Sequence, residues 1–126
     1  MHRHPYMCQI LPGTFMLRCD LGWMAIYDRL FTCFEDEFLQ DPASLRRFRL
    51  LQITEEFGCM RVYYRFEDPD WVPEDLRARL RDLTRQAELQ SRKTCQRCGQ
   101  PGELRRFGGR GATLCARHAR QVSVDD

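Results

Sequence analysis

The segment CQRCGQPGELRRFGGRGATLCARH, residues 95–118, decides how this chain folds. It contains two pairs of metal-ligand residues, Cys95-x2-Cys98 and Cys115-x2-His118, with 16 residues between the pairs. Each pair places two soft or borderline ligands about one turn apart, which is the bite that a small tetrahedral ion needs. A spacer of this length allows a short hairpin to return the second pair to the first. The spacing therefore predicts one structural Zn²⁺ bound by these four residues.

The residue after the second cysteine supports this interpretation. Gly99 is free to adopt a positive φ, which lets the chain fold around a metal while backbone N–H groups point at the thiolates, so CQRCG is typical of a zinc knuckle. Four ligands close the coordination shell, and a structural role is expected rather than a catalytic one. Two alternatives stay open. A redox C-x-x-C normally follows a strand and opens a helix, unlike Cys95 here, and the cysteines could also carry no ligand.

The segment RLLQITEEFGCMRVYYRFED, residues 49–68, has the period of two that is typical of strands on both sides of Gly58. It predicts a β-hairpin with one face packed on a helix. The packed face is expected to carry Leu51, Ile53, Phe57, Met60, Val62, Tyr64 and Phe66. The open face is expected to carry Thr54, Glu56, Arg61, Tyr63 and Arg65, and Glu55 fits neither set.

Helical spacing of apolar residues predicts a helix on each side of this hairpin. The first spans about Trp23 to Gln40, after which Asp41 is expected to cap a short helical turn that begins at Pro42 and runs through about Phe48. The second begins near Pro73, and its seam is too short for a coiled coil, so we expect it to pack on the hairpin. The apolar stripe of the first helix, expected to be core, is Trp23, Tyr27, Leu30, Phe31, Phe34 and Phe38. The seam of the second is Leu76, Leu80, Leu83 and Ala87.

Two resemblances follow from these motifs. GELRRF and GATL read as two short strands between the ligand pairs, and ARHARQ as a helix; this order resembles a treble-clef zinc finger over about residues 95–121, a structural class with many functions. The combination of ITEEFGCMRVYY, CQRCGQPG and LCARH also resembles a group of small, poorly characterised bacterial and prophage proteins, over roughly residues 45–120. The hairpin departs from that group's usual pattern at two places. Cys59-Met60 stands where Gly or Leu is usual, and Val62 stands where Phe is usual. The resemblance implies bacterial origin and a zinc fold, and it assigns no catalytic residue.

The elements together predict an α+β fold: helix, β-hairpin, helix, then a C-terminal treble-clef-like zinc finger. We expect the 126 residues to form a single small domain. Within it, residues 1–93 are the helix, hairpin and helix body, residues 94–121 are the zinc-binding subdomain, and residues 122–126 are a tail.

Composition narrows the class of protein. A hydrophobic content of 43% with 30% charged residues excludes extended disorder, and no apolar run approaches the roughly 20 residues that cross a bilayer, so no membrane association is expected. The N-terminus lacks the unbroken apolar stretch of a signal peptide. The cysteines outside the metal motif show no close pairing, which indicates free thiols in a reducing compartment, and a cytoplasmic location is expected. These cysteines, whose roles the sequence leaves open, are Cys8, Cys19, Cys33 and Cys59.

Catalysis is the least supported function, and we expect no enzyme activity. His118 is assigned to zinc, and the other two histidines, His2 and His4, lie at a terminus that is expected to fray. Glu55 and Glu56 are adjacent in a predicted strand, so their carboxylates point to opposite faces and cannot share a substrate.

Nucleic-acid binding is the alternative function. Residues 74–126 carry twelve basic and seven acidic residues, a formal charge of +5, whereas residues 1–73 carry −3. Basic residues concentrate around the zinc motif, and zinc fingers commonly contact phosphate backbones. No base-reading helix is recognisable. The candidate nucleic-acid-binding residues are Arg97, Arg105, Arg106, Arg110, Arg117 and Arg120.

Protein binding is the leading function. A small, metal-stapled α+β domain without a catalytic constellation is typical of an inhibitor, an adaptor or a toxin-neutralising immunity protein. The acidic N-terminal half offers carboxylates to a basic groove of a partner, which would accelerate association, and the open face of the hairpin offers Arg and Tyr side chains. The candidate partner-binding residues are Glu35, Asp36 and Glu37 on the first helix and Arg61, Tyr63 and Arg65 on the hairpin.

Overall fold

The computed structural model describes residues 16–18 and 20–125, and it confirms the α+β class. The predictions that concern His2, His4, Cys8 and Cys19 lie outside the described residues. The first part of the chain forms β1 (Met16–Arg18), the 3-10 turn η1 (Leu21–Trp23), α2 (Met24–Gln40), α3 (Pro42–Leu45), β2 (Phe48–Glu56) and β3 (Cys59–Phe66). The second part forms the 3-10 turn η2 (Pro69–Trp71), α4 (Glu74–Ser91), β4 (Glu103–Phe107), β5 (Arg110–Leu114) and α5 (Ala116–Asp125).

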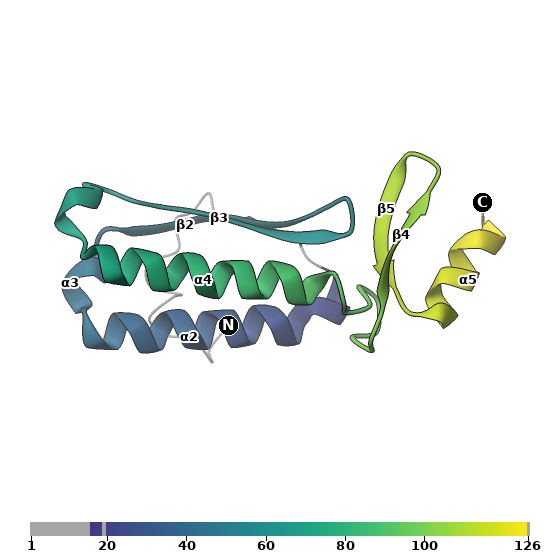
Figure 1. Ribbon diagram of the computed structural model, residues 1–126, viewed down its shortest axis with the longest axis horizontal. Helices are drawn as coiled ribbons and strands as arrows, with labels where there is room; N and C mark the ends of the chain where they lie inside the picture. Colours follow the sequence, from purple (N-terminus) through teal and green to yellow (C-terminus); the bar gives the residue numbers. More distant parts are fainter. Residues whose placement is uncertain (1–15, 19, 126) are drawn as a thin grey trace.

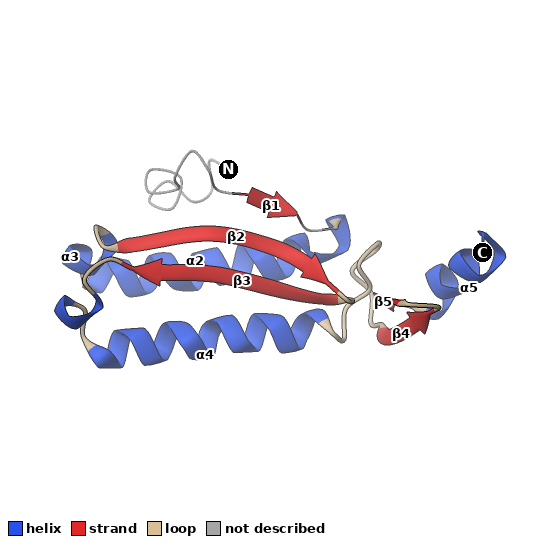
Figure 2. Ribbon diagram, turned by 90° about the horizontal axis from the view of Figure 1, so that it is seen from above, coloured by secondary structure: helices blue, strands red, loops and turns tan. Residues whose placement is uncertain are grey.

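The body consists of one sheet layer and one helix layer. The sheet has the strand order β1-β2-β3, with β1 parallel to β2 and β2 antiparallel to β3. Helices α2 and α4 run side by side along the same face of this sheet (Figures 1 and 2). Strand β1 was not predicted from the sequence. None of the helices in the described part of the chain is both long and apolar enough to cross a bilayer.

Aromatic side chains form the core between the two layers. Every residue of the predicted α2 stripe is buried, and Phe34 packs edge-on against Phe48 of β2, with 5.6 Å between the ring centroids. The predicted seam of α4 packs on the same cluster, with Leu76, Leu80 and Ala87 buried and Leu83 partly buried. These contacts confirm that both amphipathic helices bury their apolar faces on the hairpin.

The hairpin is confirmed, but two of its side chains were assigned to the wrong surface. A register shift between Leu50 and Gln52 inserts an extra residue in β2, so Leu50 is fully buried and Leu51 is 37% exposed. Phe57 was expected in the apolar face. It lies instead in the two-residue turn between the strands, where its side chain is 76% exposed.

The segment after α2 begins as predicted but ends earlier. The Asp41 carboxylate accepts hydrogen bonds from the backbone N–H and the hydroxyl of Ser44, at 3.2 and 2.7 Å, which caps α3. The helix ends at Leu45 rather than near Phe48, because Phe48 is fully buried as the first residue of β2. At the other end of the chain α5 runs on to Asp125 and includes residues 122–125 of the expected tail.

Side chains of α4 cover the outer edge of the sheet. The backbone N–H of Met60 donates to the Ser91 hydroxyl at 2.9 Å, and that of Val62 donates to the Glu88 carboxylate at 3.1 Å. Edge strands with unpaired N–H groups invite pairing with other chains. Here α4 satisfies these two donors of β3.

The C-terminal part, from the knuckle at Cys95 to α5, stands at the end of the body where α2 begins and where the β2–β3 turn lies (Figure 1). The backbone N–H of Gly22 donates to the carbonyl oxygen of Gln96 at 2.7 Å, and the Trp23 indole donates to that of Thr94 at 2.9 Å. A Cβ on Gly22 would lie 2.2 Å from the carbonyl oxygen of Cys95. Only a glycine therefore allows this close approach between body and knuckle.

Gly22→Ala is expected to disrupt this contact, because the new methyl group would overlap backbone atoms that no side-chain rotation can move. Gly109→Ala is the matched control, since nothing lies within 4 Å of a Cβ built there. We expect Gly22→Ala to lower the free energy of unfolding by about 1–3 kcal/mol, and Gly109→Ala to change it by less than about 1 kcal/mol. Thermal unfolding measures both. Equal melting temperatures for the two variants would contradict the close approach.

Candidate metal centre

The four predicted ligands come together in the structure. One ligand atom from each of Cys95, Cys98, Cys115 and His118 lies within 4.8 Å of all the others. The Sγ atoms of Cys98 and Cys115 are 3.8 Å apart, and His118 Nδ1 lies 3.5 Å from Cys95 Sγ and 3.3 Å from Cys115 Sγ. This Cys₃His group can hold a metal ion. It is the one such cluster among the described residues.

Local backbone geometry places the first ligand pair. Gly99 has φ of 79°, and its N–H donates to the carbonyl oxygen of Cys95 at 2.9 Å, which closes the knuckle. The Cys95 N–H donates to the carbonyl oxygen of Gln100 at 2.7 Å. The positive φ explains why a glycine follows the second cysteine, as the sequence predicted.

The short hairpin returns the second pair to the first. Strands β4 and β5 pair antiparallel from Glu103 opposite Leu114 to Phe107 opposite Arg110, as predicted. Cys115 directly follows β5, and His118 lies in the first turn of α5. The observed order of knuckle, hairpin and helix is the one on which the treble-clef resemblance was based; membership of that class stays a prediction.

The metal-free thiols differ in their readiness to ionise. Burial opposes ionisation of Cys95, yet hydrogen bonds from the backbone N–H groups of Cys115, Cys98 and Arg97 outweigh it and lower its pKa to about 6. The pKa of Cys98 is raised: the Gln100 N–H favours its thiolate, but the loss of some solvation and the neighbouring sulfurs of Cys95 and Cys115 oppose it more strongly. Cys95 is therefore the first thiol to present a thiolate to an incoming cation.

Gln96 anchors the centre, and sequence reasoning missed it. Its side chain is buried between the two knuckle cysteines and the body, where Nε2 donates to the Asp20 carboxylate at 2.8 Å and Oε1 accepts from the Thr113 N–H at 2.6 Å. Its own N–H donates to the carbonyl oxygen of Thr113 at 2.9 Å. A glutamine between two cysteines gives no signal of this role, because both partners are distant in the sequence.

The predicted acidic surface on α2 is not a continuous one. Glu35 is buried, and Glu37 accepts a hydrogen bond from Arg79 Nε of α4 at 2.8 Å. Among the three, Asp36 is the one that is exposed and is not paired with Arg79. Helical periodicity placed these residues outside the apolar stripe, but it could not show that α4 packs beside them.

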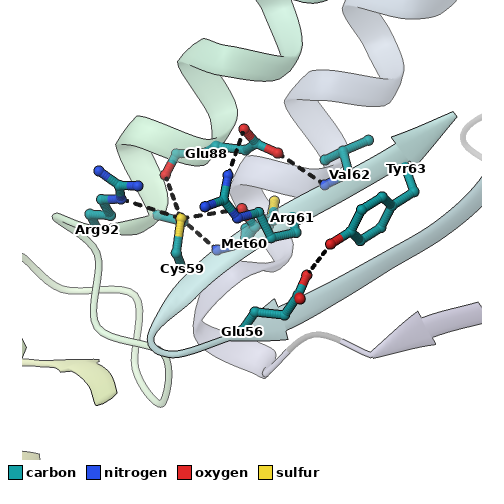
Figure 3. A network of polar contacts seen from close by, with 9 residues as sticks. Glu56, Cys59, Met60, Arg61, Val62, Tyr63, Glu88 and Arg92 are labelled. Atoms are coloured by element: carbon teal, nitrogen blue, oxygen red, sulfur yellow. Dashed lines mark hydrogen bonds and ion pairs between the residues drawn. The ribbon is translucent and has the colours of Figure 1, made fainter. Parts of the chain in front are cut away.

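The predicted hairpin surface is exposed, and part of it is already engaged. Arg61, Tyr63 and Arg65 lie on the sheet face away from the helices. Arg61 pairs with Glu88 at 3.8 Å, and the Tyr63 hydroxyl donates to the Glu56 carboxylate at 2.5 Å (Figure 3).

The six predicted nucleic-acid-binding arginines are not gathered in one hollow. Arg106 and Arg110 line the same hollow, whereas Arg97 and Arg110 line a second, smaller one. Arg105 donates to the carbonyl oxygen of Leu114 at 3.2 Å and lies 3.8 Å from Glu103. Arg117 and Arg120 are exposed on α5 and line neither hollow.

The larger hollow, which we call the composite groove, has a volume of about 750 Å³ and joins both parts of the molecule. On one side it is lined by the body residues Glu56, Phe57, Cys59, Arg61, Tyr63, Glu88 and Arg92. On the other side it is lined by Leu104, Arg106 and residues 108–111 of the C-terminal hairpin. Cys59, whose role the sequence left open, is buried, and Arg92 Nε donates to its Sγ at 3.3 Å (Figure 3).

The chain matches no protein-family model, no curated protein and no solved structure.

Metal affinity is expected to rise with pH, since protons compete with the metal for the thiolates. With its raised pKa, Cys98 must lose a proton on binding throughout the neutral range. Cys95 must also lose one once the pH falls below its pKa of about 6, so the loss of affinity with acid should steepen there. Competition against a chelator of known pH dependence measures this slope. An affinity independent of pH would contradict coordination by these thiolates.

Proposed function

We propose that Cys95, Cys98, Cys115 and His118 bind one structural Zn²⁺. Zn–S bonds of about 2.3 Å and Zn–N bonds of about 2.1 Å in a tetrahedron imply ligand separations of about 3.8 Å between sulfurs and about 3.6 Å between sulfur and nitrogen. Three of the six separations here are 3.8 Å between Cys98 and Cys115 Sγ, and 3.5 and 3.3 Å from His118 Nδ1 to Cys95 and Cys115 Sγ. All six lie within 4.8 Å. Thiolates and imidazole are also the ligand types that zinc prefers, and four of them leave no position for a substrate.

The C-terminal part has too small a core to be stable by itself, which is why we assign the ion a structural role. Its own core has three buried members among the described residues, Cys95, Leu114 and Ala119. A hairpin of two five-residue strands is marginal by itself. A structural zinc site contributes on the order of 10 kcal/mol to folding. The ion is proposed to hold β4, β5 and α5 together, in the manner of the treble-clef finger that the motif resembles.

Cys98→Ser should abolish stoichiometric zinc binding, whereas Cys33→Ser should not, because Cys33 is a free thiol on α2 outside the cluster. Elemental analysis of the purified proteins checks this, with about one equivalent expected in the wild type and in Cys33→Ser. Unchanged zinc in Cys98→Ser, or well under one equivalent in the wild type, would show that the assignment is wrong.

We further propose that the protein is an interaction module that binds another protein, and the composite groove is the observation that carries this proposal. The groove brings together Arg61 and Tyr63, expected to contact a protein, and Arg106 and Arg110, expected to contact nucleic acid. Exposed Arg and aromatic side chains at the centre of a concave surface are typical of protein interfaces. One wall belongs to the zinc-bound hairpin, so binding depends on the metal.

Two carboxylates in the groove favour a protein over a nucleic acid. Glu56 and Glu88 lie among its lining residues. They would oppose the charge that a phosphate backbone carries at every nucleotide, whereas a peptide can place its few carboxylates beside the arginines and uncharged residues beside Glu56 and Glu88. The inhibitor or immunity role is the finer part of the proposal, and it is supported by the resemblance to bacterial and prophage proteins. Such a protein would act in a reducing cytoplasm, which suits the free thiols of Cys33 and Cys59.

A comparative capture tests the interaction. The tagged zinc-loaded protein, the groove variant Arg106→Gln/Arg110→Gln and the α5 variant Arg117→Gln/Arg120→Gln are each incubated with nuclease-treated extract of the source cells. We expect the wild type and the α5 variant to retain the same partner protein and the groove variant to lose it.

A nucleic-acid function would give the opposite pattern. Binding would then disappear with nuclease treatment, both double variants would weaken it, and affinity for a duplex or a single strand would persist at physiological salt while falling steeply as salt rises further. That pattern would overturn the protein-binding proposal.

A further inference from the structure

We propose that the composite groove binds an acidic peptide segment of the partner, with one apolar side chain of that segment packed against Phe57. This inference rests on the proposed protein-binding function and names the chemistry that the groove recognises. It is drawn from the charges of the groove, the conformation of Phe57 and the way in which the C-terminal hairpin holds that residue.

The charges in the groove leave two arginines for a ligand. Of the four arginines that line the groove, Arg61 pairs with Glu88, and Arg92 donates to Cys59 Sγ at 3.3 Å. Glu88 also accepts from the Val62 N–H, and Glu56 accepts from the Tyr63 hydroxyl (Figure 3). Neither Arg106 nor Arg110 forms an ion pair with another described residue. A guanidinium presents a planar fork that matches a carboxylate with two parallel hydrogen bonds. The unpaired charge of the groove therefore suits Asp and Glu side chains.

Phe57 occupies a position that a phenylalanine disfavours. Its φ is 55° and that of Gly58 is 83°, so both residues of the turn have positive φ, a conformation for which Asn-Gly is the preferred pair. The ring is 76% exposed, so burial does not compensate for the backbone strain. Tyr63 and Leu104, both partly exposed, line the same groove. Contact with an apolar group of a ligand explains why a large ring is present here.

The C-terminal hairpin fixes this turn. The Thr113 hydroxyl donates to the carbonyl oxygen of Gly58 at 2.6 Å. Gly111 packs so closely that a Cβ on it would lie 2.6 Å from the carbonyl oxygen of Phe57. The strained turn is therefore held in one orientation, and Phe57, Arg106 and Arg110 all line the groove. A preorganised anchor of this kind reduces the entropy that a ligand loses on binding.

The test uses a fluorescent peptide of alternating Glu and Leu with a central Phe, and a matched peptide with Gln in place of every Glu. Fluorescence anisotropy measures the affinity of both for the zinc-loaded protein, and amide chemical shifts of the labelled protein locate the contact. We expect the acidic peptide to bind at least about tenfold more tightly than the Gln peptide, with shifts at Phe57, Tyr63 and Arg110 and none along α5.

Variants separate recognition from folding. Arg106→Gln/Arg110→Gln should weaken binding of the acidic peptide about tenfold or more, while Arg117→Gln/Arg120→Gln should leave it unchanged. Phe57→Asn should also weaken binding, yet its melting temperature should rise by roughly 2–6 °C, since Asn accepts a positive φ more readily. Damage to the fold cannot produce this pair of effects.

Several results would overturn the proposal: equal binding of the two peptides, equal effects of the two arginine pairs, or chemical-shift changes confined to residues outside the groove. Tighter binding of a single-stranded oligonucleotide than of the acidic peptide would assign the groove to nucleic acid. If the acidic peptide fails but the groove variant still loses the captured partner, the proposed peptide chemistry is wrong and the protein-binding function stands.

Discussion

The hydrogen bond from the Trp23 indole to the carbonyl oxygen of Thr94 joins the two parts of this molecule. Trp23 is fully buried in the aromatic core, and Thr94 directly precedes the first metal ligand. A buried indole N–H requires a partner, so the core presents a fixed donor that the knuckle must meet. Gly22 makes the second bond, to the carbonyl oxygen of Gln96. The backbone on both sides of Cys95 is therefore positioned by the body.

The positions of the metal ligands and of β5 depend in turn on the hydrogen bond between Trp23 and Thr94. The position of the knuckle determines where Cys95 and Cys98 meet Cys115 and His118, and a metal held by all four would fix the position of β5. β5 in turn contacts the β2–β3 turn through Thr113 and closes one side of the composite groove. The metal thus does no chemistry in this account. In the function that we propose, it couples the aromatic core to the composite groove, so that metal loading and ligand binding become linked properties.

The ligand set and the two long helices could be predicted because their signals are local: ligands three residues apart, and apolar side chains every three or four residues. The face of the sheet on which each side chain of β2 lies could not be predicted. The adjacent Leu50 and Leu51 fit either register, and only the bulge decides between them. The packing around the acidic residues of α2 could not be predicted either, because Glu37 pairs with Arg79, 42 residues away. The sequence carries no signal for Gln96, Gly22 and Thr113 for the same reason. The role of each depends on a contact with a residue distant in the sequence.

The emission of Trp23 during metal removal tests most directly whether the metal holds the C-terminal part against the body. The chain has two tryptophans, and Trp71 is 76% exposed, stacked with Arg47 at 5.5 Å. Trp71→Phe keeps a ring for that contact and leaves Trp23 as the single reporter. On removal of zinc by a chelator, the emission should shift to longer wavelength as water reaches the indole freed from Thr94, and it should return when zinc is restored. An unchanged emission after complete metal removal would show that the body and the metal centre are not coupled.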